Sequence, residues 1–454
     1  MNNVLNGNNL LDEVKLIQSK SKISIISVGS HSPAYQFSDL PEPDAIFKQE
    51  NAESVCFWLK FDWHVMFAKA ISESNDNLGF ICVRPDERAK ELIGWKIRNN
   101  LITIHCPSKM IKRLGGADCI EESKSLLEYL KEIYKEVPKT LMIIMAPGSK
   151  FGRKLIKKVN IFVPNGYLMA HALGDTPLLI SIKKLKELLF NLKIRDKLRF
   201  IKHLYIRIFN QRIEKSLYKN LYFLWVPTEE SRKHWKEFTN CQIVLTSGGY
   251  DANVWQPAED KIKLRELLGF KKEEAVILSN CVLIPKKRLD DLIKAANIIK
   301  EKIKIKLIIS GYGEQSERNR LEYLVKELGM KNDVIFTGYV EENKLINLYQ
   351  AADVFVHLSA AEGGPASCKQ ALATNTPIVM TPVGSVGKFI QESNMGKLFP
   401  VGDIYACAEA IIQTLNLKKN NSTSDYAYKL WSWNARGKMM AEDIENVYCR
   451  IFNK

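Results

Sequence analysis

Short apolar runs alternate with amphipathic stretches along the first half of the chain. Runs of continuous apolar and β-branched character end at a Gly, a Pro or a polar turn; they lie at 22–30, 77–84, 100–107, 140–148 and 159–166. Between the last two comes 119–137, which has helical spacing and acidic residues in its first turn. Apolar strands that alternate with helices indicate a parallel sheet covered on both faces. The first half is therefore predicted to be an α/β domain.

The alternation restarts after "CQIVLTSGGYDANVWQP" (241–257), where a strand leads into a glycine-rich linker. Apolar runs predict strands at 274–280, 305–313, 333–340, 353–359 and 376–381. Helical spacing predicts helices at 286–303, 316–330, 342–352 and 366–374. Two successive α/β units of comparable size are therefore expected, with no close sequence repeat between them. The polar residues 1–21 are expected to be a flexible N-terminus, and the first domain to span 22–245.

One segment of the first half, 181–220, differs from the rest. It contains 12 Lys or Arg and only three Asp or Glu, and its leucines and isoleucines mostly recur at three- and four-residue steps. This pattern indicates a basic amphipathic helical region. Such a region fits either a core-facing helix with a solvated basic back or a helix that adsorbs to an anionic lipid surface. A nucleic-acid patch is disfavoured because no recognisable reader motif surrounds it.

Composition narrows the classes of protein and partner. A chain of 454 residues with 46% hydrophobic and 26% charged residues is typical of a globular protein of two domains. The formal net charge of +15 favours anionic partners, although a lysine-rich composition alone would also produce it. The nine cysteines form no C-x-x-C pair, which disfavours a zinc ribbon and fits a reducing compartment. No signal peptide or spanning helix is evident, so a cytoplasmic protein is expected, possibly peripheral at the inner face of the membrane.

Candidate chemistry gathers at the carboxyl ends of the predicted strands of the second unit, where open α/β sheets bind ligands. Glycines there let the main chain approach a ligand, and a helix N-terminus attracts phosphate. Carboxylate and amide oxygens accept hydrogen bonds from sugar hydroxyls. Each feature alone also fits a tight turn, a solvated lysine or a helix cap, but their order along one α/β unit indicates a nucleotide-sugar pocket. The residues are Lys287, Arg288, Gly311, Gly313, Gly338, Tyr339, Glu362, Gly363, Gly364, Pro365, Ala366 and Gln370.

Residues 246–425 resemble the nucleotide-sugar domain of the family 4 retaining glycosyltransferases of the GT-B fold, also called glycosyl transferases group 1. The resemblance rests on "GGYDANVWQP", "SNCVLIPKKRLDDLIKAA", "LIISGYGEQ", "VIFTGYV" and "SAAEGGPASCKQALATNTPIVMTPVGSVGKFI", which follow one another in the family's order. It implies two Rossmann-like domains that face each other across a cleft. The first half resembles the family only in layout. Residues 426–454 resemble its terminal helix, which crosses back to the first domain.

The resemblance also implies roles for individual residues. Lys287 matches the lysine that pairs with the donor diphosphate, and Glu362 matches the first of two glutamates, the one that contacts the donor sugar. Gly29 resembles the glycine loop that faces the donor phosphates. His171 is a candidate for a catalytic histidine of the first domain, although a lone histidine is more often structural. The remaining expected donor contacts are Arg288, Gly311, Gly338, Tyr339, Gly363, Gly364, Pro365, Ala366, Ser367 and Gln370.

The sequence also departs from the family pattern. The second phosphate-binding residue, an arginine in the family, falls on Val282, and the second glutamate, which holds the ribose, falls on Gln370. The glycine after the acidic helix falls on Asn375, Lys388 stands where an acidic residue is usual, and Asn165 where the family often has histidine. Losing one charge-assisted contact to a diphosphate weakens binding about tenfold or more, unless Arg288 or another cation substitutes.

The sequence therefore predicts a retaining glycosyltransferase. It would move a sugar from a nucleotide-sugar donor to a hydroxyl of a glycan or lipid-linked acceptor, in surface polysaccharide or lipopolysaccharide synthesis. As the resemblance implies, no metal ion, cofactor or carboxylate nucleophile is required. The alternative from another class is a catalytically weak or inactive glycosyltransferase-like binding subunit, which the changes at Val282 and Gln370 would fit. A nucleotide-sugar epimerase shares the architecture but fits the motif order less well.

Overall fold

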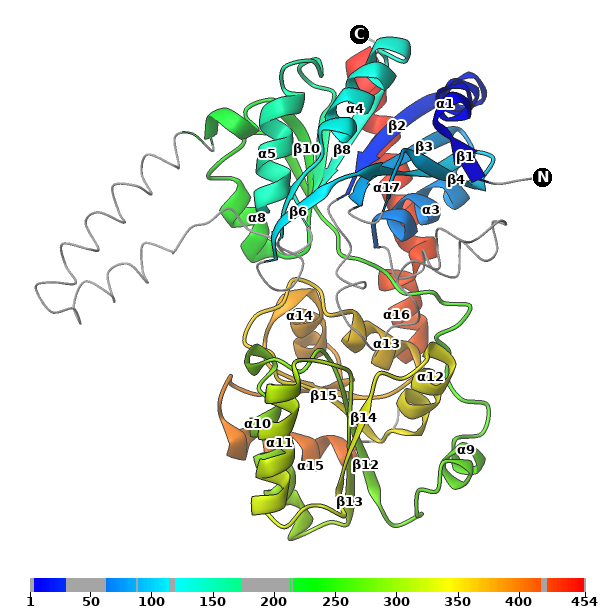
Figure 1. Cartoon of the computed structure of the whole chain (residues 1–454). Helices are drawn as coiled ribbons and strands as arrows, with labels where there is room; N and C mark the ends of the chain where they lie inside the picture. The colour runs from blue at the N-terminus through cyan, green and yellow to red at the C-terminus, as the bar shows by residue number, and fades with distance from the viewer. Residues whose placement is uncertain are drawn as a thin grey trace, which may run out of the picture. The chain divides into compact units, whose positions relative to one another are not determined.

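The computed structural model describes residues 4–29, 63–86, 89–113, 119–172, 213, 215–417 and 423–452. They form two compact units (Figure 1). The first contains the described residues up to Thr246 and those from Gly437 onward, and the second spans Ser247–Arg436. Most of the basic segment 181–220 lies outside the described residues, so the prediction of an amphipathic helix there stays a prediction.

The first unit is built on a nine-stranded sheet with the order β1-β4-β5-β3-β2-β8-β9-β10-β11. From β5 to β11 every neighbouring pair is parallel, whereas β4 is antiparallel to β5 and β1 is antiparallel to β4. The strands are β1 (Val4–Asn6), β2 (Ile23–Val28), β3 (Leu78–Asp86), β4 (Ile93–Arg98), β5 (Leu101–Pro107), β8 (Leu141–Met145), β9 (Leu168–His171), β10 (Leu221–Val226) and β11 (Gln242–Leu245). A separate antiparallel hairpin pairs β6 (Lys109–Arg113) with β7 (Cys119–Glu122).

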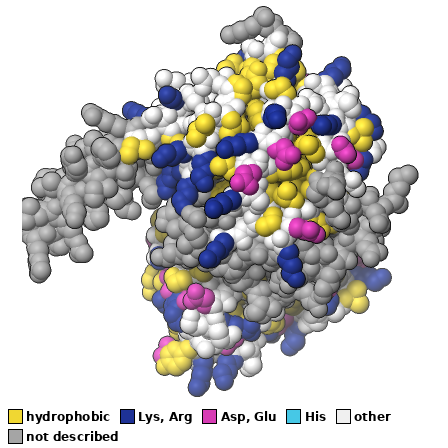
Figure 2. Space-filling view, turned by 45° about the horizontal axis from the view of Figure 1, so that its top comes forward, with side chains coloured by type: hydrophobic (Ala, Val, Ile, Leu, Met, Phe, Trp, Pro, Cys, Tyr) yellow, Lys and Arg dark blue, Asp and Glu magenta, His cyan; other side chains and the backbone are white. Residues whose placement is uncertain are grey.

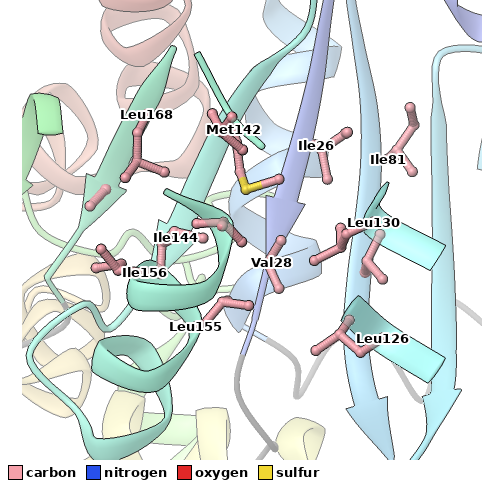
Figure 3. Packing of buried hydrophobic residues seen from close by; sticks show 14 of the residues in the cluster. Ile26, Val28, Ile81, Leu126, Leu130, Met142, Ile144, Leu155, Ile156 and Leu168 are labelled. Carbon is pink, nitrogen blue, oxygen red and sulfur yellow. The ribbon is translucent and has the colours of Figure 1, made fainter. Parts of the chain in front are cut away.

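Helices cover both faces of this sheet. Figure 3 shows leucines and isoleucines of α4 (Lys124–Glu136) and α5 (Lys150–Val159) packed on β2, β3, β8 and β9. Both helices begin where a serine accepts a hydrogen bond from the first turn, Ser123 for α4 and Ser149 for α5. The opposite face is covered by α3 (Trp63–Ser74) and by α17 (Trp433–Phe452). A short helix, α8 (Glu229–Trp235), joins β10 to β11.

The second unit has a six-stranded sheet, parallel throughout, with the order β14-β13-β12-β15-β16-β17. Its strands are β12 (Ala275–Asn280), β13 (Ile305–Ser310), β14 (Val334–Gly338), β15 (Val354–His357), β16 (Ile378–Met380) and β17 (Gly396–Leu398). Its helices are α9 (Lys261–Leu267), η3 (Pro285–Lys287), α10 (Leu289–Lys300), α11 (Gln315–Glu327), α12 (Glu342–Ala351), α13 (Ala366–Ala373), α14 (Gly384–Glu392), α15 (Ile404–Leu415) and α16 (Thr423–Trp431). One apolar cluster contains residues of α10, α11 and α15, and a second contains residues of α12, α13, α14 and α16. The two covered parallel sheets confirm the predicted α/β architecture.

The structure differs from the sequence-based expectations in three stretches. Residues Gly7–Lys20, expected to be flexible, form helix α1, because Leu10, Val14 and Ile17 recur on one face and are buried in the core of the first unit. The acidic residues expected in the first turn of the 119–137 helix belong to β7 instead, and the helix begins at Lys124.

The strand expected at 159–166 is wrong. Helix α5 ends at Val159, turns follow, and β9 begins only at Leu168. Ile161 is 82% exposed, whereas Val159 and Val163 on either side of it are buried, so the apolar residues of this run belong to the end of a helix and a turn. Burial of Phe151, Leu155, Ile156 and Val159 on one side of α5 explains why the residues before it are helical.

Candidate functional site

Two loops of the second unit meet at the carboxyl edge of its sheet. The first leaves β12 and forms the single turn η3, which carries Lys287. The second leaves β15, the strand that pairs with β12, and carries Glu362 ahead of α13. The backbone N–H of Ala360 donates a hydrogen bond to the carbonyl of Lys286 at 3.1 Å, which ties the two loops together. The fold thus brings together two predicted site residues that are 75 positions apart in the sequence.

Lys287, Glu362 and His357 form a charged cluster at this edge. The Nζ atom of Lys287 pairs with Oε1 of Glu362, and the two side chains are 18% and 17% exposed. Nε2 of His357, at the end of β15, lies 3.5 Å from the same oxygen, the long limit of a hydrogen bond. Burial acts to raise the pKa of Glu362, but the contacts from His357 and the charge of Lys287 outweigh it and hold the pKa well below its usual range. Burial lowers the pKa of His357, which therefore stays neutral near pH 7.

The glycines after Glu362 place backbone rather than side chains at the start of α13. Gly363 and Gly364 are half-buried, and Pro365 precedes the first turn, which contains Ala366 and Ser367. The carbonyl of Gly363 accepts a hydrogen bond from the backbone of Ser385 at 3.0 Å, which fixes this loop against α14. The N-terminal end of a helix attracts anions, so the loop can serve a phosphate group.

The glycines after β13 and β14 lie side by side. The N–H of Gly311 donates to the carbonyl of Gly338 at 3.0 Å. Gly311 has φ +128°, and a Cβ there would lie 1.9 Å from the carbonyl oxygen of Cys281, so only glycine fits. Tyr339 follows Gly338, is half-buried and has a raised pKa, mainly because of burial. These residues therefore form the part of the carboxyl edge next to β12.

The positions that depart from the family pattern have specific environments. Arg288 does not extend from the edge as a lone cation, because its Nε donates to Asp291 at 2.6 Å on the first turn of α10. Val282 and Gln370 are both half-buried. Asn375 has φ +57°, a conformation that asparagine tolerates better than most residues, so it replaces the family's glycine at little conformational cost.

In the first unit, Gly29 lies directly after β2 and against His64 of α3. A Cβ at position 29 would lie 2.4 Å from Nδ1 of His64, so the close packing of this ring requires glycine. The other ring nitrogen of His64 is 2.8 Å from the hydroxyl of Ser27. His171 ends β9, is 2% exposed and stacks on Phe67 at 5.1 Å, with Trp225 edge-on at 6.2 Å. This packing gives His171 a structural role, and its catalytic role stays a prediction.

Sequence reasoning missed three polar side chains at these edges. His357 and His64 are 3% and 5% exposed, and Lys369 of α13 is fully buried. A histidine at the end of an apolar strand, as in "DVFVHLS", is the signal that marks His357. For Lys369 the only signal is a lysine inside the small, mostly uncharged helix "ASCKQALA".

The first unit also carries a basic groove of about 800 Å³ at the amino ends of β10 and β11. We define the basic groove by its four cations, Lys215, Lys219, Lys236 and Arg450; Glu237 is the one carboxylate among the described residues that line it. Among the described residues of the whole chain, no group of three or more His, Cys, Asp or Glu side chains could hold a metal ion. Within the same residues, every helix is too short or too polar to span a bilayer.

Comparison with known proteins finds similarity to glycosyltransferases. Residues 260–430 match the family model described as Glycosyl transferases group 1. An uncharacterized glycosyltransferase of Methanocaldococcus jannaschii is 31% identical over 206 residues, which cover 44% of this chain and 50% of that protein. The alpha-monoglucosyldiacylglycerol synthase of Streptococcus pneumoniae is 27% identical over 187 residues, which cover 40% of this chain and 42% of that protein. The chain therefore spans half or less of the length of these two curated relatives.

Solved structures show the fold of the whole chain. The structure of Anabaena HepE in complex with UDP has a TM-score of 0.63 to this chain at 15% identity, and covers 93% of this chain and 100% of that one. At this identity the likeness concerns the fold alone. The fold is GT-B, with two Rossmann-like domains, as the sequence predicted.

Proposed function

We propose that the chain is a retaining glycosyltransferase that uses a nucleotide-sugar donor. The observation that carries the proposal is the pairing of Lys287 with Glu362 beside the glycine loop that begins α13, inside the segment that matches Glycosyl transferases group 1. A cation, a sugar-binding carboxylate and a helix N-terminus are the groups that a nucleotide sugar requires. The similar HepE structure was solved with UDP, which supports a nucleotide-linked donor.

In the proposed reaction, the acceptor hydroxyl attacks the anomeric carbon from the face that the diphosphate leaves, while the bond from that carbon to the diphosphate breaks and the hydroxyl proton passes to the departing diphosphate oxygen. The ammonium of Lys287 and the N-terminal end of α13 stabilise the negative charge that develops on the leaving diphosphate. Glu362 accepts hydrogen bonds from hydroxyls of the donor sugar, and its depressed pKa keeps it an acceptor at neutral pH. Because Lys287 pairs with Glu362 in the free chain, donor binding requires Lys287 to turn part of its hydrogen bonding toward phosphate. No step needs a metal ion or a cofactor.

The acceptor is proposed to be a glycan or a lipid-linked glycan of a surface polysaccharide or lipopolysaccharide pathway. The name of the Streptococcus pneumoniae relative indicates synthesis of a glycolipid by a similar protein. The basic groove of the first unit, whose Lys215 and Lys219 belong to the basic segment 181–220, supports contact with an anionic membrane surface. Figure 2 shows a face of the molecule on which Lys and Arg side chains predominate over Asp and Glu.

The direct test is donor binding and transfer with UDP-glucose, GDP-mannose and ADP-glucose. We expect the wild-type chain to bind at least one of them and Lys287→Ala to weaken that binding about tenfold or more, since a charge-assisted hydrogen bond contributes about 1.5–3 kcal/mol. Lys302→Ala is the matched control, because Lys302 is exposed just before β13, at the opposite edge of the sheet. It should leave binding unchanged.

The outcomes separate the two candidate functions. Binding with turnover that Lys287→Ala abolishes supports an enzyme. Binding without turnover supports the alternative, a glycosyltransferase-like binding subunit, which Val282 and Gln370 favour because each replaces a charged family residue with a neutral one. Failure of the wild-type chain to bind or turn over any of the three donors contradicts the transferase, whereas a subunit that binds a partner or a glycan does not depend on these donors.

A further inference from the structure

Lys369 is a buried cation that the proposed reaction does not use. It lies on the fourth position of α13 and its side chain is 0% exposed. Its neighbours on the helix, Cys368, Ala371 and Leu372, are buried and mostly apolar. Removing an ammonium from water is costly unless hydrogen bonds replace its hydration. The position of Lys369 therefore depends on specific partners.

The partners lie on the linker that enters the second unit. The Nζ atom of Lys369 donates to the hydroxyl of Ser247 at 3.0 Å and to the carbonyl of Gly248. Within the part of the chain that the structure describes, no carboxylate pairs with it. Among the described residues, its hydrogen-bond partners are thus two neutral oxygens of neighbouring residues, the side-chain hydroxyl of Ser247 and the backbone carbonyl of Gly248.

The Nζ atom of Lys369 also lies next to the Gly363–Gly364 loop. A Cβ at Gly364 would be 3.3 Å from Nζ of Lys369, 3.0 Å from Cβ of Ser247 and 3.2 Å from the hydroxyl of Ser385. The backbone of Ser385 donates to Gly363, and its hydroxyl is 3.4 Å from that of Ser247. A side chain at Gly364 would therefore crowd Lys369 and Ser247 and force its neighbours to move by a few tenths of an ångström, so the glycine loop packs closely against both residues.

We propose that Lys369 is a positioning residue: its amino group fastens the linker at Ser247–Gly248 to α13 and thereby fixes the Gly363–Gly364 loop in the shape that receives the donor diphosphate. The part of this proposal that concerns the donor rests on the proposed function, whereas the fastening of loop and linker does not. Ser247 and Gly248 accept hydrogen bonds from this amino group in its charged and in its neutral form.

Protonation gives the proposal a signature that simple packing lacks. The pKa of Lys369 is lowered to about 7, mainly by burial and to a smaller extent by the nearby charge of Arg436. Cys368 acts in the opposite direction and raises it. The amine is charged below that pH and neutral above it, whereas in an opened, hydrated arrangement its pKa returns towards the ordinary value of 10.5. The closed arrangement therefore binds the proton less well than the opened one, so the loop and the linker should tighten as the pH rises above about 7.

Hydrogen–deuterium exchange of the full ligand-free chain tests the fastening. Peptides that cover 246–250 and 363–368 are compared at about pH 6 and about pH 8.5, after correction for intrinsic exchange, on either side of the Lys369 pKa. In the wild type we expect severalfold higher protection of both peptides at the higher pH, where the closed arrangement holds a neutral amine. In Lys369→Met, which keeps the length of the side chain without its hydrogen bonds or its charge, we expect protection that does not change with pH and that lies below the wild type at the higher pH. Lys294→Met, at a partly exposed lysine of α10, is the matched control and should behave as the wild type.

A second variant and a ligand arm keep the outcomes distinct. Ser247→Ala retains the lysine and removes one acceptor, so it should give an intermediate loss in the same two peptides even if Lys369→Met does not fold. Protection that is unchanged in both variants, or lost equally in β12 and β13, overturns the proposal. Titration with UDP-glucose, GDP-mannose and ADP-glucose should show about tenfold weaker binding to Lys369→Met. If the wild type binds none of them, the proposed function fails while the exchange result still decides the role of Lys369.

Discussion

At the scale of single residues, the Lys287–Glu362–His357 cluster balances its charges within the protein itself. The ammonium and the carboxylate neutralise each other, so neither is left as an unpaired charge at less than 20% exposure. His357 stays neutral because burial lowers its pKa, and its ring can donate to Glu362 without adding charge. A donor diphosphate would compete with Glu362 for Lys287. The affinity for a donor would therefore depend on the difference in free energy between the contact of Lys287 with the diphosphate and its contact with Glu362.

This arrangement predicts how Glu362 contributes to stability as a function of pH. The folded-state pKa of Glu362 lies below its ordinary value of 4.5, so the pair stabilises the folded chain above about pH 4.5 and loses this contribution as the pH falls further. Glu362→Gln should lower the free energy of unfolding by about 1–3 kcal/mol at pH 7, between the values typical of exposed and buried pairs. The difference from wild type should narrow in acid.

Urea unfolding of both proteins between about pH 7 and pH 4 measures this effect. Glu266→Gln, at an exposed glutamate of α9, is the matched control and should follow the wild type at every pH. A stability difference for Glu362→Gln that stays constant, or grows, as the pH falls would contradict the charge pairing.

At the scale of elements, most of the second unit could be predicted from the sequence because each signal is local. The expected helices at 316–330 and 342–352 correspond to α11 and α12 within a few residues. The contacts that make the site could not be predicted, because they join residues far apart: 75 positions for Lys287 and Glu362, and 122 for Lys369 and Ser247. Strands β1 and β4 were not predicted either, because Val4–Asn6 is only three residues long and Ile93–Arg98 contains two basic residues, so neither stands out as an apolar run.

Gly311, directly after β13, is the glycine whose replacement we expect to destabilise the fold most. In Gly311→Ala the new methyl group would meet the carbonyl of Cys281, which belongs to the backbone after β12 and has no rotamer to escape into. We expect a loss of about 3 kcal/mol or more, in the range of severe overpacking. Gly269→Ala is the matched control: φ is also positive, at +77°, but nothing lies within 4 Å of the added Cβ.

That control should cost about 1 kcal/mol, the strain of a left-handed residue alone. The midpoints of thermal unfolding of the two variants provide the comparison. Equal losses in Gly311→Ala and Gly269→Ala would show that conformation, rather than the close approach of β12 and β13, accounts for the glycine.

At the scale of the whole molecule, the described residues pass from the first unit to the second after Thr246 and return to the first after Arg436. The two connecting segments are hydrogen bonded to each other through their backbones. The carbonyl of Tyr250 accepts from the N–H of Trp433, and the N–H of Tyr250 donates to the carbonyl of Trp431, both at 2.9 Å. After Arg436 the chain rejoins the first unit as the main part of α17, whose Asp443 accepts from the indole of Trp225 at 2.8 Å. The last residues of the chain thus complete the core of its first unit. Arg450 of the basic groove comes from this returning helix.

The net charge of +15 and the basic groove together predict selective binding to anionic membranes. We expect the wild type to sediment with phosphatidylcholine vesicles that contain phosphatidylglycerol, less so as salt rises, and not with pure phosphatidylcholine. Each basic residue near such a surface contributes about 1 kcal/mol. The triple variant Lys215→Glu, Lys219→Glu, Lys236→Glu should therefore bind about a hundredfold more weakly or worse.

A matched triple variant separates the groove from the total charge. Lys271→Glu, Lys272→Glu and Lys302→Glu lower the net charge by the same amount at exposed positions of the second unit. If membrane contact is made by the groove, this control should keep most of the wild-type vesicle binding, because screening limits each charge to a range of about 8–10 Å. Equal losses in both triple variants would assign the binding to net charge alone. Absence of wild-type binding to the anionic vesicles would reject the membrane contact, while donor binding in the second unit would remain an independent question, since none of these six lysines belongs to the Lys287–Glu362 site.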